Sequence, residues 1–135
     1  MEEKIEIRKD LNEIVKKIGF GTVKSNYGTR HPLRVILEDG TSQGKILEFR
    51  DSDGVYDAVQ SYQSLGVTDF IKSKELVEET SVDEDGTVTG KYICVKYELV
   101  DGNIFRFFPS RTQNIIIENL YKLYKKNHKA PVKQG

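Results

Sequence analysis

Two arginines beside a run of aromatic residues are the side chains of this chain best suited to bind a ligand. Residues 103–111 read NIFRFFPSR, so Arg106 stands among phenylalanines and Arg111 follows Ser110. Ser110 is a preferred helix N-cap, and the free N–H groups of a helix start concentrate positive potential. Acids are favoured in such a first turn, but residues 111–114, RTQN, contain none. This pattern predicts a cradle for phosphate or carboxylate. The alternative is that Arg111 leans away to a surface acid.

The orientation of Arg106 depends on the turn before its strand. Asp101-Gly102 favours a two-residue hairpin turn, which would pair Tyr97 with Arg106. Alternation then puts on one face Ile93, Val95, Tyr97, Leu99, Ile104, Arg106 and Phe108. An isolated buried charge is too costly, so Arg106 must be paired, stacked or at the rim of the sheet. In one interpretation Arg106 stacks on Tyr97 and meets a carboxylate of a helix. In the other it holds an anionic ligand, and Tyr97, Phe105 or Phe107 offers a stacking surface.

A second basic cluster lies in the first third of the chain. Arg30, His31 and Arg34 surround a proline at the end of the polar segment 25–32. Loops of this kind often carry function, so the three side chains are candidate ligand-binding residues. The alternative is an ordinary solvated loop.

Other chemistry is sparse in this sequence. Cys94 is the only cysteine and lies in an apolar strand, which favours a buried structural role. Two histidines do not make a multi-histidine metal site, and the acidic segments 51–54 and 83–86 lack the ligand spacing of a calcium loop. No nucleophile, phosphate-loop or dinucleotide motif is present. We therefore expect a non-enzymatic protein with no catalytic residues, no metal and no cofactor.

Composition indicates one soluble domain, residues 1–135, with a frayed tail over 128–135. Lys+Arg and Asp+Glu both number 21, so the formal net charge is zero. Non-specific nucleic-acid binders usually carry a basic excess, which makes this class less favoured. The sequence holds no apolar run of membrane-spanning length and no signal-peptide pattern. A cytoplasmic protein without membrane contact is the expectation.

The hydrophobic periodicity predicts an α+β fold: an antiparallel, hairpin-built sheet packed by N-terminal and C-terminal helices plus a short middle helix. Helical spacing predicts helices over 2–17, about 55–65 and 111–126. Alternating segments bounded by Asp-Gly pairs predict strands over 20–24, 33–38, 41–49, 76–82, 87–100 and 103–108.

Together these features predict a small binding protein that holds, and thereby sequesters, a phosphorylated, nucleotide-like small molecule. Arg106 and Arg111 would bind the anion, because a base offers a π face to aromatic neighbours and a phosphate a charge to arginine. Two alternatives stay open. One is a protein–protein module, an inhibitor or regulator and possible homodimer, in which an open face displays Phe105 and Phe107. The other is a nucleic-acid binder that uses Arg111 with the lysines of the last helix, Lys122, Lys125, Lys126 and Lys129.

Overall fold

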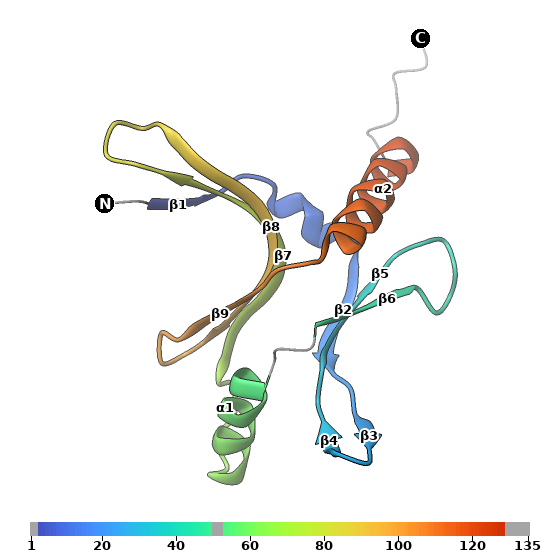
Figure 1. Ribbon diagram of the computed structural model, residues 1–135, viewed down its shortest axis with the longest axis vertical. Helices are drawn as coiled ribbons and strands as arrows, with labels where there is room; N and C mark the ends of the chain where they lie inside the picture. Colours follow the sequence, from blue (N-terminus) through green and yellow to red (C-terminus); the bar gives the residue numbers. More distant parts are fainter. Residues whose placement is uncertain (1–2, 50–52, 129–135) are drawn as a thin grey trace.

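A computed structural model describes residues 3–49 and 53–128 of the chain. Its fold is α+β, as predicted, with antiparallel sheets, a C-terminal helix, a middle helix and a short helix near the N-terminus (Figure 1). In chain order the elements are β1 (Glu3–Glu6), the 3-10 helix η1 (Lys9–Ile14), β2 (Val15–Phe20), β3 (Val23–Ser25), β4 (Gly28–Arg30), β5 (Leu33–Leu37), β6 (Lys45–Phe49), α1 (Asp53–Ser64), β7 (Ile71–Val82), β8 (Val88–Leu99), β9 (Ile104–Phe107) and α2 (Arg111–His128).

The larger sheet has four antiparallel strands in the order β1-β7-β8-β9. Its centre is the long, curved hairpin of β7 and β8 (Figure 1). The smaller sheet, in the order β2-β5-β6, lies on the other side of the core, and β3 and β4 form a separate two-stranded hairpin. Alternation explains the packing: β5 buries Leu33, Val35 and Leu37 and leaves the residues between them half-exposed.

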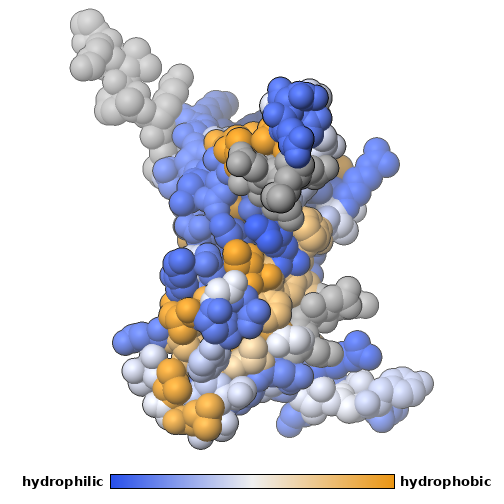
Figure 2. Space-filling model, turned by 90° about the vertical axis from the view of Figure 1, so that its left-hand side faces the viewer, coloured by the Kyte–Doolittle hydropathy of each residue, from blue (hydrophilic) through white to orange (hydrophobic). Residues whose placement is uncertain are grey.

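The core fills the space between the two sheets and the helices. β8 and β9 contribute Val95, Tyr97 and Phe107, and α2 contributes the fully buried Ile117. No helix or strand of the described residues covers the opposite side of the larger sheet, which is lined by charged side chains. Figure 2 views the molecule from that side, where hydrophilic residues dominate and hydrophobic ones form patches between them.

The N-terminal helix is much shorter than predicted. The segment 2–17 was expected to be one helix, but its described part forms β1, the 3-10 helix η1 and the start of β2. Leu11 and Ile14, both fully buried, are three residues apart, which suits one side of a 3-10 helix. Ile7, counted in the apolar stripe, is instead 46% exposed. The apolar residues of this segment have helical spacing, but the chain pairs as strands instead, β1 with β7 and β2 with β5.

The hairpin between β8 and β9 has a longer loop than predicted. The Leu99 N–H donates to Asn103 O, so three residues close the turn, with Gly102 at a φ of +92°. Strand pairing therefore joins Lys96 to Arg106 and Tyr97 to Phe105. A shift of one residue moves every side chain of the strand to the other face. Arg106 is thus on the charged side of the sheet, and Phe105 and Phe107 face the core.

Two other loops differ in detail from the prediction. Asp39-Gly40 begins a longer loop, because β5 ends at Leu37 and β6 begins at Lys45. The polar segment 25–32 contains β4 and the tip of the β3–β4 hairpin. The expected strand 20–24 is divided between the end of β2 and β3, and β7 begins at Ile71, five residues before its expected start. The bounds of α1, β8, β9 and α2 lie within two residues of expectation. His128 is the last residue of α2, and the rest of the expected tail, 129–135, lies outside the described residues.

Candidate functional site

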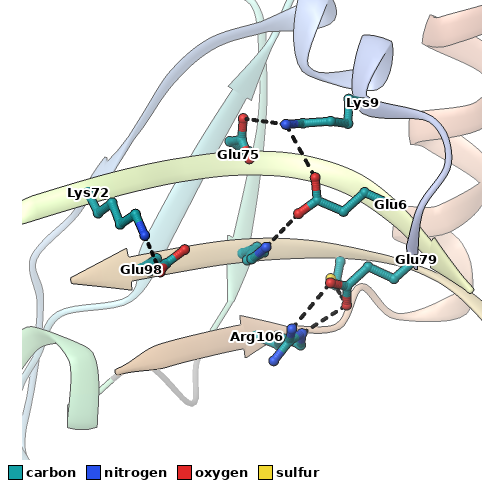
Figure 3. Close-up of polar contacts among 9 residues, drawn as sticks. Glu6, Lys9, Lys72, Glu75, Glu79, Glu98 and Arg106 are labelled. Carbon is teal, nitrogen blue, oxygen red and sulfur yellow. Dashed lines mark hydrogen bonds and ion pairs between the residues drawn. The ribbon is translucent and has the colours of Figure 1, made fainter. Parts of the chain in front are cut away.

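Arg106 is held by a buried carboxylate of the neighbouring part of the sheet. Its Nε and Nη2 donate to the two oxygens of Glu79, at 2.8 and 3.2 Å (Figure 3). The Glu79 side chain is 1% exposed and that of Arg106 is 21% exposed. Burial raises the pKa of Glu79, but the hydrogen bonds and charge of Arg106 outweigh it, so that pKa lies below its ordinary value. The partner of Arg106 is thus a strand carboxylate, and Tyr97 lies on the opposite face.

Arg106 belongs to a set of ion pairs that crosses the charged side of the sheet (Figure 3). Lys96, its neighbour on β8, binds Glu6 of β1. Lys9 lies 3.3 Å from Glu6, and Lys72 pairs with Glu98 at 3.2 Å. These contacts hold the neighbouring charged side chains, while the two hydrogen bonds to Glu79 set the orientation of the Arg106 guanidinium.

The start of α2 is closed by a capping box. The Gln113 N–H donates to Ser110 Oγ at 3.1 Å, and the Ser110 N–H donates to Gln113 Oε1 at 2.9 Å. Gln113 Nε2 also donates to Glu48 O at 2.9 Å, which joins the helix start to β6. Arg111 is exposed, and no hydrogen bond or ion pair joins its side chain to a side chain within 5–49 or 54–127. The expected surface acid is therefore not found among those residues.

A pocket of about 350 Å³ lies where β9, β6 and the start of α2 meet. We call it the β9–α2 pocket. Its lining residues are Glu48, Phe49, Arg106, Phe107, Phe108, Ser110 and Gln113. The fold thus brings Arg106 and the helix start together, as the sequence indicated. The Ser-x-x-Gln capping box was visible in the sequence, but the contribution of β6 required the tertiary structure.

The aromatic residues expected to flank the ligand are divided between the core and the pocket. Tyr97 is 2% exposed in the core, and burial raises the pKa of its hydroxyl. Phe105 packs partly buried against the core. Phe107 is buried, lines the pocket and lies 6.4 Å from the ring of Phe49. The expected open face bearing Phe105 and Phe107 is therefore the internal face of the sheet.

The cluster of Arg30, His31 and Arg34 is split among three environments. Arg34 Nε donates to Glu48 Oε2 at 2.7 Å, and its guanidinium lies across Gly21, where a Cβ would sit 2.4 Å from Cζ. The His31 ring stacks on Tyr56 of α1, with centroids 3.9 Å apart. Arg30 is exposed on β4. None of the three lines the β9–α2 pocket.

The lysines of α2 are only partly available to a nucleic acid. Lys125 forms an ion pair with Asp10 at 2.7 Å, while Lys122 and Lys126 are exposed. Lys129 lies outside the described residues.

Cys94 is fully buried on the charged side of the sheet, with Sγ 3.6 Å from Glu79 Oε1. Within residues 3–49 and 53–128, no three His, Cys, Asp or Glu side chains are grouped to hold a metal ion. No helix in the same part of the chain has the length and apolar character needed to cross a membrane.

In comparisons with known proteins, no family model, no curated protein and no solved structure matches the chain.

Proposed function

We propose that this protein is a non-enzymatic binding protein for a small molecule that carries a phosphate, nucleotide-like in its combination of ring and charge. The ligand occupies the β9–α2 pocket. One observation carries the proposal: an arginine, a helix start and three phenylalanine rings line the same pocket. The volume of about 350 Å³ falls at the lower end of small-molecule sites.

Arg106 keeps donors for a ligand although it is bound to Glu79. A guanidinium has five N–H donors, and the two hydrogen bonds to Glu79 use one on Nε and one on Nη2. The donors on Nη1 and the second on Nη2 remain. The buried carboxylate also fixes the plane of the guanidinium, and such preorganisation lowers the entropic cost of binding. In this proposal Glu79 is a positioning residue and Arg106 contacts the phosphate.

The start of α2 adds a second source of positive potential. The first N–H groups of a helix have no acceptor within the helix, and Ser110 Oγ satisfies only that of Gln113. The Arg111 side chain is exposed directly after the cap. Among the described residues that line the pocket, Glu48 has the only carboxylate, and Arg34 pairs with it at 2.7 Å. An incoming phosphate therefore meets a site whose acids are already paired.

Phe49, Phe107 and Phe108 supply the apolar wall of the pocket. Aromatic rings stack on any base, so this wall favours a nucleotide over inorganic phosphate.

Thermal denaturation with and without a panel of nucleotides tests the proposal. The wild type should be stabilised by at least one nucleotide, and less by inorganic phosphate. Arg111→Glu should abolish that shift and keep or raise the melting temperature without ligand, because an acid suits the first turn of a helix. Lys122→Glu is the matched control, since it makes the same charge change at an exposed position of α2. If no nucleotide shifts the wild type, or if both variants respond like the wild type, the proposal is wrong.

A further inference from the structure

The β3–β4 hairpin projects from the end of the smaller sheet and contributes nothing to the core (Figure 1). We call residues 22–30 the hairpin arm; every one of them is exposed. Tyr27 lies in its turn and is 97% exposed. The turn is held by Ser25 Oγ, which accepts from the Tyr27 N–H and donates to Gly28 O. A two-stranded hairpin of this size is marginally stable by itself, so stability of the fold does not explain the arm.

The arm is part of a segment without acidic residues. From Ile14 to Leu37 the chain has no Asp or Glu, and its cations are Lys16, Lys17, Lys24, Arg30 and Arg34. The side chains of Lys24 and Arg30, on the arm itself, form no ion pair or hydrogen bond with any residue whose side chain the structure describes, 5–49 and 54–127. By contrast, Arg8, Arg34 and Arg106 are all held by carboxylates. The formal net charge of the chain is zero, although this segment is purely basic.

The Tyr27 ring and the Arg30 guanidinium of the arm belong to the same groove. Strand pairing joins Val23 to Arg30 and Lys24 to Thr29, so the two cations lie on opposite faces of the arm. Arg30 and Tyr27 line one groove of about 440 Å³, together with Val23, Ser25, Pro32 and Glu48. Glu48 is the acidic residue in the lining that the structure describes for this groove, and its carboxylate forms an ion pair with Arg34.

We propose that the hairpin arm binds single-stranded nucleic acid. Unpaired cations on both faces attract backbone phosphates, and the fully exposed Tyr27 ring offers a stacking platform to an unpaired base. A duplex keeps its bases stacked on one another, so the ring favours a single strand. The groove shares Glu48 with the β9–α2 pocket, but neither Tyr27 nor Arg30 lines that pocket, so the two proposals rest on different side chains.

Fluorescence anisotropy of labelled DNA and RNA oligonucleotides, single-stranded and duplex, at several salt concentrations tests the proposal. The wild type should bind the single strands more tightly than the duplexes. If Lys24 and Arg30 each neutralise one phosphate, log K should fall against log salt with a slope of about −1.4. Tyr27→Ser should weaken binding by roughly 5- to 100-fold, the effect of losing one stacked base. The double variant Lys24→Glu with Arg30→Glu should abolish it.

Arm variants change exposed residues outside the core, so their melting temperatures should equal that of the wild type. Arg111→Glu should bind the single strands as the wild type does, which separates this proposal from that for the pocket. Lys122→Glu is the control for the basic face of α2. The proposal is overturned if the wild type binds no oligonucleotide at low salt, if duplex is preferred, or if the arm variants bind like the wild type.

Discussion

At the scale of single residues, the pairing of Arg106 with Glu79 decides how the candidate site is built. A carboxylate that is 1% exposed needs its partner, because an uncompensated buried charge is strongly destabilising. Arg106→Met should therefore lower the free energy of unfolding by about 3 kcal/mol, the lower end of the usual range for a broken buried pair. The loss is expected at the lower end because Arg106 is partly exposed, so that in the variant water can reach the Glu79 carboxylate.

Urea denaturation of Arg106→Met and of the double variant Arg106→Met with Glu79→Leu measures this effect. The double variant should recover most of the loss, because an apolar pair of similar volume removes the buried charge. A single variant as stable as the wild type would mean that Glu79 finds another partner, and the positioning role assigned to it would be wrong.

The sequence indicated the candidate site only in part at this scale. The pattern of an arginine in an aromatic strand followed by a capped helix singled out Arg106 and Ser110, and both line the β9–α2 pocket. Glu79, however, is 27 positions from Arg106 along the chain, and nothing local marks it as the partner. Glu48 and Phe49 join the site through the packing of β6, which no spacing in the sequence reveals.

At the scale of elements, the capping box couples the start of α2 to the pocket. Ser110→Ala removes the acceptor of the Gln113 N–H and should destabilise the protein by about 1 kcal/mol. The freed N–H group then becomes a further donor toward the pocket. Calorimetry of unfolding checks the first effect. Unchanged stability would indicate that the cap is replaced by water or by another side chain.

Periodicity predicted α1, α2 and β8 because each has a clear pattern over twelve or more residues. It predicted only residues 76–82 of β7, which begins at Ile71. It failed at the N-terminus, where apolar residues at helical spacing also satisfy a short 3-10 helix followed by a strand. It failed again at Asp101-Gly102, since this pair occurs in loops of more than one length. That one-residue difference placed Arg106 on the wrong side of the sheet and put Phe105 and Phe107 on an open face.

At the scale of the whole molecule, ion pairs join segments that are distant in the sequence. Arg8, between β1 and η1, binds Glu78 of β7 at 2.7 Å and Glu118 of α2 at 2.9 Å. The hydrogen bonds that Arg8 donates to Glu118 and Glu78 raise the pKa of Arg8, and Arg8 in turn lowers the pKa of Glu118. The glutamates of β7 thus supply internal partners to Arg8 and Lys9 near the N-terminus and to Arg106 of β9.

These pairs predict loss of stability in acid. Glu6, Glu79 and Glu118 have folded-state pKa values below the ordinary 4.5. A carboxyl with a lowered folded pKa contributes stability above its unfolded pKa, and this contribution is lost as the pH falls through the folded value. The melting temperature should be nearly constant from about pH 8 to 6 and should fall steadily below about 4.5. The melting temperature of the double variant Arg106→Met with Glu79→Leu should fall less in acid than that of the wild type. An equal fall would mean that Glu79 does not contribute to the loss of stability in acid.

The central claim is that a phosphate-bearing ligand occupies the β9–α2 pocket. The most direct test is a two-dimensional amide NMR titration of the assigned protein with the nucleotide that gives the largest thermal shift. The account predicts that the amide signals of Phe108, Arg111 and Thr112 move together and saturate, while those of residues 22–30 stay in place. Signals that move only elsewhere, or no movement at millimolar nucleotide, would contradict the claim.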